Sequence, residues 1–142
     1  GMTKMGQAAI FETRGNSDCH LILRGGKVPN YSAAHVEEAC TALRNNGLRE
    51  QVMIDMSHAN SSKQHRKQIE VAADIAAQIA GGDIRITGVM NEIHRNEGRH
   101  DLCQKPLQHS FSRTDACISM EQTVPVLQQL SAAVRKRRGN AV

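Results

Sequence analysis

Short apolar runs alternate with longer segments in which apolar residues recur at helical spacing. The runs cover residues 20–23, 52–55 and 84–90, and each is bounded by Gly, Asn or Ser, which is typical of strands buried on both faces. Two segments between them carry apolar stripes with a period of 3.6 residues, which predicts helices. The stripes consist of Val36, Ala39, Cys40 and Leu43 in one segment and Ile69, Ala72, Ala73, Ala76 and Ala80 in the other. We expect these helices to end at Gly47 and Gly81.

A third helix is predicted near the carboxyl end of the chain. It should begin near Thr123, with Pro125 in its first turn, and finish in the cationic run 135–138, which suits the negative end of a helix dipole. Its inward-facing residues are expected to be Leu127, Leu130 and Val134. The cationic run is interpreted as a solvated helix end, with a phosphate or nucleic-acid patch as the alternative.

Two segments fall outside this alternation. Residues 7–13 are a strand candidate, joined to the run at 20–23 by the turn-rich stretch 14–18 as a hairpin or an extended entry loop. Residues 93–120 show little periodicity, and so long a connection inside a compact domain is usually functional or mobile.

The alternation of strands and helices predicts an α/β fold made of about three successive βα units with a parallel sheet. A length of 142 residues fits one domain, residues 1–142. Gly1 before Met2 is interpreted as the remnant of an expression tag, so we expect the native chain to start at Met2.

The composition argues against nucleic-acid binding, a membrane span and a disulfide framework. The formal net charge of +4 is too mild to mark a nucleic-acid binder, and two Phe, one Tyr and no Trp provide neither a base-stacking platform nor an aromatic membrane belt. No apolar run approaches the 18 or so residues of a membrane span. The four cysteines are widely separated and form no C-x-x-C pair, so we expect no disulfide framework and a reducing, cytoplasmic location.

A cation, an imidazole and a carboxylate follow the three predicted strands. Arg24, His58 and Glu92 are each 34 residues apart, about one βα unit, so equivalent positions of successive units carry them. Ligands of parallel α/β folds bind at the rim formed by the carboxyl ends of the strands. The sequence therefore predicts that these three side chains share one site.

The neighbouring residues suggest two kinds of ligand. Gly25 and Gly26 would let the backbone approach an anion, and the small polar run 57–63 before a helix is compatible with phosphate. His58 and Glu92 suit a divalent ion such as Mn²⁺, Fe²⁺ or Zn²⁺, to which Asp115 could add an oxygen ligand. Competing ligands in the long loop are His94, His100 and His109.

Several strings of residues are similar to a known enzyme family. They cover residues 15–27, 29–31, 57–63, 88–90 and 114–118. Together they resemble the C-terminal part of class I 3-deoxy-D-arabino-heptulosonate 7-phosphate (DAHP) synthase. The resemblance implies a partial (β/α)₈ barrel, the last three βα units preceded by a hairpin-like segment. The implied activity is the metal-dependent condensation of phosphoenolpyruvate with erythrose 4-phosphate, the first step of the shikimate route to aromatic amino acids.

The resemblance also implies roles for individual residues. Arg24 would bind phosphoenolpyruvate, with Gly25 and Gly26 beside it, and His58, Glu92 and Asp115 would bind the metal. Arg24 and His58 are therefore the expected catalytic residues, and His58 is also expected to contact substrate. The family's fourth metal ligand, a cysteine, lies in an upstream segment that this chain lacks.

Because part of that site is missing, we expect the chain alone to be inactive. It would form a homo-oligomer or associate with a complementary barrel half. The alternative is a non-catalytic fragment that oligomerises or binds a full-length synthase.

Overall fold

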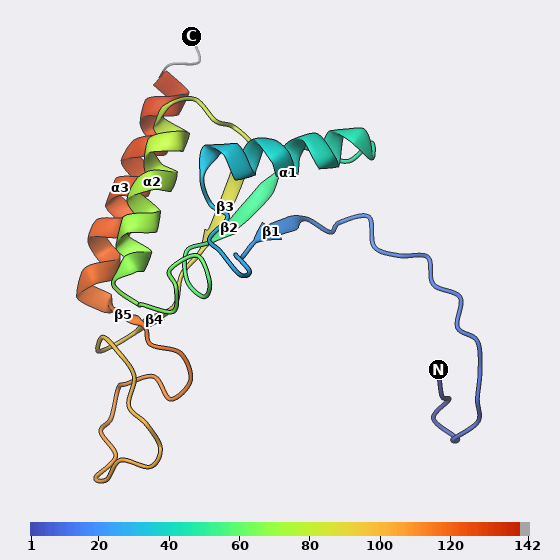
Figure 1. The fold of residues 1–142 in the computed structure, drawn as a ribbon, viewed down its shortest axis with the longest axis horizontal. Helices are drawn as coiled ribbons and strands as arrows, with labels where there is room; N and C mark the ends of the chain where they lie inside the picture. Colours follow the sequence, from blue (N-terminus) through green and yellow to red (C-terminus); the bar gives the residue numbers. More distant parts are fainter. Residues whose placement is uncertain (140–142) are drawn as a thin grey trace.

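The structure, a computed structural model, describes residues 1–139. It contains three main strands, two very short ones and three helices (Figure 1). In chain order they are β1 (Leu21–Leu23), α1 (Ala33–Asn45), β2 (Val52–Asp55), α2 (Lys67–Ala80), β3 (Ile86–Met90), β4 (Ile93–His94), β5 (Ile118–Ser119) and α3 (Met120–Gly139).

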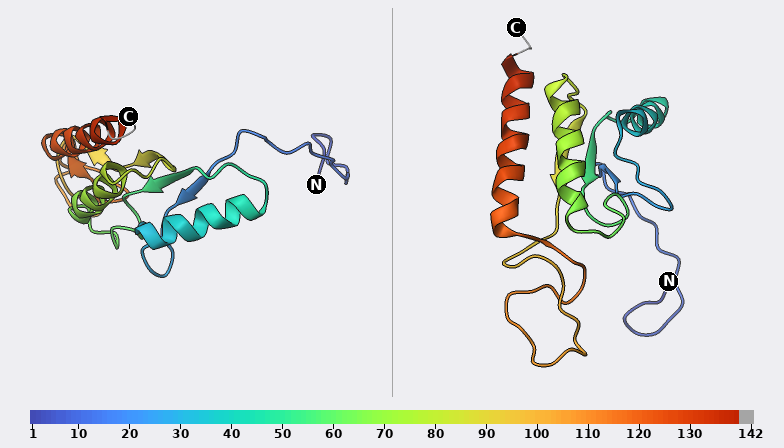
Figure 2. Two further views of the ribbon diagram at one scale, coloured as in Figure 1. Left: turned by 90° about the horizontal axis from the view of Figure 1, so that it is seen from above. Right: turned by 60° about the vertical axis from the view of Figure 1, so that its left-hand side comes forward.

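The sheet is parallel, as the alternation predicts. β2 lies between β1 and β3, and β4 and β5 form a second parallel pair just beyond β3. In the register of the sheet, Ile22 lies beside Met53 and Met53 beside Gly88. α2 and α3 run side by side in both views, and α1 packs against the other end of the sheet (Figure 2).

The core lies between the helices and one face of the sheet. Its most deeply buried apolar side chains, each at most 1% exposed, are Val36, Cys40, Val52, Ile54, Met56, Ala72 and Ile75. The expectation that all three strands are buried on both faces is wrong for β1, where Leu21 and Ile22 are 38% and 47% exposed. β1 is an edge strand whose only partner among the described residues is β2, so one face and one edge remain open.

The first two helices match their predicted ends. α1 stops at Asn45 and is followed by Gly47 in the left-handed conformation (φ +66°). α2 stops at Ala80, immediately before Gly81. The third strand starts two residues later than predicted, because the Asp83 carboxylate accepts the Arg85 backbone N–H and holds this stretch in a turn.

α3 begins earlier than predicted, at Met120 rather than near Thr123. The Ser119 hydroxyl accepts the Gln122 backbone N–H, and the Gln122 side chain accepts the Ser119 N–H, which is a capping box. The prediction that Leu127 faces inward is wrong, since it is 56% exposed. The inward stripe consists of Thr123, Val126, Leu130 and Ala133, with Val134 partly buried beside it.

Residues 7–13 do not form the predicted strand. In the amino-terminal segment the backbone makes one isolated antiparallel bridge, between Met2 and Ala8, and then extends away from the sheet (Figure 1). No strand of the described chain lies alongside residues 7–13, so their backbone finds no ladder partner. Ile10 and Phe11 are consequently exposed.

The long connection 95–117 folds into a lobe below the helices (Figure 2). Gly98 and Cys117 exchange two backbone hydrogen bonds, and the His100 N–H donates to the Ser112 carbonyl. The tip, residues 101–109, is exposed throughout. The two-residue strand β5 at the end of the lobe was not predicted, because two residues carry no readable periodicity.

All four cysteines are free, as expected for a chain without a disulfide framework. Cys40 and Cys117 are buried, and Cys19 and Cys103 are exposed. Burial raises the pKa of both the Cys40 and the Cys117 thiol. Among residues 1–139, no helix combines the length and apolar character that a membrane span requires.

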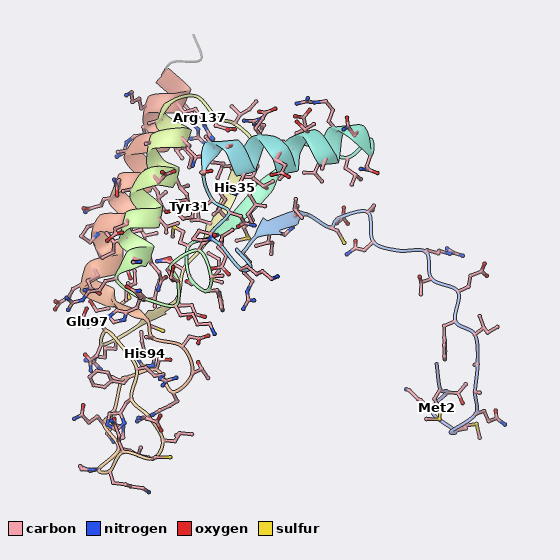
Figure 3. The ribbon with its side chains drawn as sticks, in the orientation of Figure 1. Met2, Tyr31, His35, His94, Glu97 and Arg137 are labelled. Atoms are coloured by element: carbon pink, nitrogen blue, oxygen red, sulfur yellow. The ribbon has the colours of Figure 1, made fainter. Side chains whose placement is uncertain are left out.

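Glu97 connects the lobe to the amino-terminal ends of α2 and α3. Its carboxylate pairs with Arg66 at 2.5 Å and accepts a hydrogen bond from the Gln122 amide at 2.6 Å. These contacts hold the pKa of Glu97 down at about 2, with the Arg66 hydrogen bond as the largest cause. Figure 3 shows Glu97 where the lobe meets the helices.

We predict that Glu97→Gln lowers the melting temperature at neutral pH, because the charged contact with Arg66 is lost. Since the folded-state pKa is lowered, this stabilisation is fully present above the unfolded-state pKa of about 4.5 and disappears as the pH falls through about 2. The difference in melting temperature between the two proteins should shrink over that window in thermal unfolding followed by circular dichroism. Glu12→Gln, in the extended segment, is the control and should behave as the original protein; a pH-independent difference would contradict the prediction.

Candidate active site

The parallel strands bring the predicted residues to one edge of the sheet. Arg24 follows β1, His58 lies three residues beyond the end of β2, and Glu92 lies between β3 and β4. Asp115 comes from the lobe, just before β5. The four residues therefore arrive from four segments of the chain.

Three of these side chains form a compact cluster. His58 Nε2 lies 3.3 Å from Glu92 Oε1 and 3.8 Å from Asp115 Oδ2. Within the described part of the chain this is the one group in which three potential metal-ligating atoms all lie within 4.8 Å of one another. Burial raises the pKa of Glu92, and the nearby carboxylates of Asp115 and Asp55 act in the same direction while His58 opposes them.

Asp55, which the sequence analysis did not single out, lies behind the cluster. Its side chain is 1% exposed. Oδ2 is 2.7 Å from His58 Nδ1 and 3.7 Å from Arg24 Nε, and Oδ1 accepts the Ser57 backbone N–H at 2.8 Å. One buried carboxylate thus contacts two of the predicted site residues.

Glu92 is held from behind by two further buried side chains. Its backbone N–H points at both the Ser57 hydroxyl (2.9 Å) and the Gln68 carbonyl oxygen (3.0 Å). Ser57 in turn donates to Gln68 at 2.7 Å. The end of β2, the first turn of α2 and Glu92 are thereby joined in one hydrogen-bond network.

Asn60 connects the loop that carries Arg24 to the loop that carries His58. Its amide donates to the carbonyls of Leu23 and Asp55, and its oxygen accepts the Asn30 N–H. The two loops approach so closely at Gly25 (φ +75°) that a Cβ there would lie 2.8 Å from the Cβ of Ala59. Only glycine fits this contact.

The backbone N–H groups of the two predicted anion-binding glycines are already engaged. Gly25 donates to the Asn30 side chain and Gly26 to the Val28 carbonyl. Their role in substrate binding stays a prediction. Arg24 is different, since 63% of its side chain is exposed, with its Nε 3.7 Å from Asp55 Oδ2.

The loop after β2 is folded in an uncommon backbone conformation. His58, Ser62 and Lys63 all have positive φ angles, +45°, +53° and +58°. The conformation is held by hydrogen bonds to the His58 carbonyl from the Lys63 N–H and the Ser61 hydroxyl. Such strained residues persist where the surroundings over-determine them, and they cluster at functional sites.

The donor set fits a divalent metal ion. One imidazole nitrogen and two carboxylate oxygens suit Mn²⁺, Fe²⁺ or Zn²⁺, and the other nitrogen of His58 is bonded to a carboxylate, as in many metal-binding histidines. A small cleft opens beside the three, lined by Ser57, His58, Ser61, Lys63, Gln68, Glu92, Asp115 and Ala116. That these residues bind a metal stays a prediction at this point.

The other candidate histidines lie in β4 and in the lobe. His94 Nδ1 is 2.7 Å from the Ser110 carbonyl, and His100 packs its ring against Phe111. His109 is exposed near the tip. None of them joins the cluster of His58, Glu92 and Asp115 in the described residues.

Comparison with known proteins assigns the family. Residues 2–128 match the sequence profile of the DAHP synthetase I family. The chain belongs to this family. It is 56% identical over 139 residues to the Phe-sensitive phospho-2-dehydro-3-deoxyheptonate aldolase of Escherichia coli K12, and 51% identical over 146 residues to the tyrosine-inhibited enzyme of Schizosaccharomyces pombe. The predicted resemblance is confirmed.

The match covers nearly all of this chain but less than half of each relative. It spans 97% of the chain and 40% of the Escherichia coli protein, and 99% of the chain and 39% of the Schizosaccharomyces pombe protein. The solved structure of phospho-2-dehydro-3-deoxyheptonate aldolase from Francisella tularensis superimposes with a TM-score of 0.86 at 45% identity, over 96% of this chain and 40% of that one. The chain therefore corresponds to one part of the family fold.

We predict that His58→Ala weakens Mn²⁺ binding by more than about 100-fold, because it removes the central ligand of the cluster. Loss of a residue that only contacts a ligand typically costs roughly 10- to 100-fold. Isothermal titration calorimetry with MnCl₂ measures this directly. His109→Ala is the matched control and should bind as the original chain does. Equal affinities in the two variants would show that the cluster is not the metal site.

Proposed function

We propose that this chain supplies the metal-binding edge and a phosphoenolpyruvate-binding arginine of a DAHP synthase, which condenses phosphoenolpyruvate with erythrose 4-phosphate. The observation that supports this most directly is the convergence of His58, Glu92 and Asp115 beside Arg24 at the carboxyl ends of parallel strands. Enzymes built on (β/α)₈ barrels carry their active sites at this edge. The reaction would take place in the cytoplasm, in the shikimate route to aromatic amino acids.

The residues of the chain would divide the work. The exposed guanidinium of Arg24 binds the anionic groups of phosphoenolpyruvate, since Arg is suited to carboxylate and phosphate. His58, Glu92 and Asp115 hold the divalent metal, with His58 fixed from behind by Asp55. When bound, the metal ion acts as a Lewis acid that polarises the aldehyde oxygen of erythrose 4-phosphate. Gly25 brings the loop of Arg24 against that of His58, so the anion site and the metal site stay adjacent.

We further propose that the strands form part of a (β/α)₈ barrel, which typically takes about 250 residues. This chain has 142, about 40% of the length of its relatives. The remaining groups of the site would then come from other barrel units. Catalysis requires both substrates to be held in reacting geometry, so the chain alone would not turn over.

This proposal predicts no measurable product when the purified chain is mixed with phosphoenolpyruvate, erythrose 4-phosphate and Mn²⁺. Adding a separately expressed segment that covers the other 60% or so of the Escherichia coli relative should restore product formation, measured by loss of phosphoenolpyruvate absorbance. The same mixture with Arg24→Ala should lose at least about 100-fold in rate, because an anchoring charge is gone. Robust turnover by the chain alone would contradict the need for a complement.

A second candidate function, non-catalytic association, is favoured by exposed apolar surface. Ile22 on the open face of β1 is 47% exposed, and an apolar stripe on α3 formed by Met120, Val124 and Leu127 is about half exposed. An open strand edge with apolar side chains beside it is a typical site for association. The partner would be a second copy of this chain, or the complementary barrel half.

We predict that the chain self-associates or binds the complementary segment. Ile22→Lys should weaken either contact at least about tenfold, because it places a charge on a face that the contact would bury. Ile84→Lys, at an exposed position in the connection before β3, is the matched control. Light scattering over a concentration series measures both. A chain that stays monomeric and ignores the complementary segment would rule out association as a function.

A further inference from the structure

Asp55 is the most buried charged group beside the proposed site. Its side chain is 1% exposed, and its two oxygens are used differently. Oδ1 accepts the backbone N–H of Ser57, and Oδ2 lies 2.7 Å from Nδ1 of His58. Each oxygen of this buried carboxylate therefore accepts a hydrogen bond from a different group, and neither oxygen can donate one while the carboxylate is ionised.

The fold determines where these two contacts fall. β2 ends at Asp55, and the Ser57 N–H turns back onto the carboxylate in an Asx turn. The next residue, His58, has a left-handed backbone conformation (φ +45°), and its ring lies against Asp55 with Nδ1 2.7 Å from Oδ2. The strained conformation and the contact between the imidazole and Oδ2 therefore occur at the same residue.

The imidazole has a choice of partners. Its Nδ1 meets Asp55 at 2.7 Å, while its Nε2 meets Glu92 at 3.3 Å and Asp115 at 3.8 Å. A neutral imidazole carries one proton, which will reside where the hydrogen bond is shortest and most shielded from water. Asp55 offers that position, because Glu92 and Asp115 are 25% and 56% exposed and their contacts are longer.

We propose that Asp55 is a positioning residue that keeps neutral His58 in the Nδ1–H tautomer and so directs the free electron pair of Nε2 toward Glu92 and Asp115. A metal ion needs that electron pair, whereas the Nε2–H tautomer would present a proton instead. The inference deepens the metal site proposed above and rests on it. Because Oδ2 is also 3.7 Å from Arg24 Nε, the same carboxylate keeps the anion-binding arginine beside the metal site.

The variant Asp55→Asn tests this with almost no change in shape. An asparagine has one oxygen and one NH₂ group, so it cannot accept from both Ser57 and His58. The Ser57 N–H is buried and can only donate, so it keeps the oxygen; the opposite orientation would set two donors against each other. The NH₂ group then faces Nδ1 of His58, which must become an acceptor, and the proton moves to Nε2.

The first measurement needs no metal. In ¹⁵N-labelled, metal-free protein at alkaline pH, where imidazoles are neutral, NMR distinguishes the protonated from the unprotonated ring nitrogen. The His58 signals are assigned by their loss in His58→Gln. We expect the original chain to carry the proton on Nδ1 and Asp55→Asn to carry it on Nε2. An Nε2–H tautomer in the original chain would overturn the inference even if the variant does not fold.

The second measurement is Mn²⁺ affinity by calorimetry. Asp55→Asn should weaken binding about 10- to 100-fold, as loss of an outer-shell partner does, while Asp74→Asn, the same change on an exposed carboxylate of α2, should have no effect. Unchanged affinity together with an unchanged tautomer in Asp55→Asn would refute the role of Asp55 and leave the metal site standing. A tautomer change in a chain that binds no Mn²⁺ at all would support the role of Asp55 and refute the metal site.

Discussion

Three parallel strands held in register bring distant residues to one edge of the sheet, and the candidate site depends on this alignment. Leu23 lies beside Ile54, and Asp55 beside Met90, so the strands end together. Side chains that follow the strand ends, 34 residues apart in the chain, therefore meet in space. If β1 ran antiparallel to β2, its carboxyl end would lie at the other end of the strands, and Arg24 would be one strand length from His58.

Alignment of the strands does not by itself fix the three loops that follow β1, β2 and β3. Buried polar side chains hold these loops through hydrogen bonds. Asn60 ties the ends of β1 and β2 to each other, Gln68 ties Glu92 to α2, and Asp55 ties His58 to the end of its own strand. Each of these polar groups is satisfied, which is what makes its burial tolerable. Removal of one partner would leave the other unpaired in a buried environment, which would destabilise this end of the sheet.

Much of the fold and part of the site could be predicted from the sequence, for reasons that also explain the misses. β2 and the ends of α1 and α2 follow from local apolar patterns and glycine chemistry, and these elements match. The predicted start of α3 was about three residues late, because Pro125 is typical of a first helical turn, whereas the helix is capped one turn earlier by Ser119 and Gln122. Spacing predicted Arg24, His58 and Glu92 as site residues, ligand chemistry and resemblance added Asp115, and the structure brings the four side chains together. The sequence did not predict a role for three further residues, Asp55, Asn60 and Gln68, because they act through contacts between segments that are distant in the chain. For Asp55 the one available signal was an acidic residue at the end of an apolar run, three residues before His58.

The same open architecture that exposes the site also exposes apolar surface. A closed barrel has no edge strand, whereas here β1 has a free edge and carries Leu21 and Ile22 into solvent. The amino-terminal segment, which would need a partner strand to become ordered by pairing, extends alone with Ile10 and Phe11 exposed. Because burying each such side chain is worth about 1.5–3 kcal/mol, these exposed residues favour the kind of association proposed above.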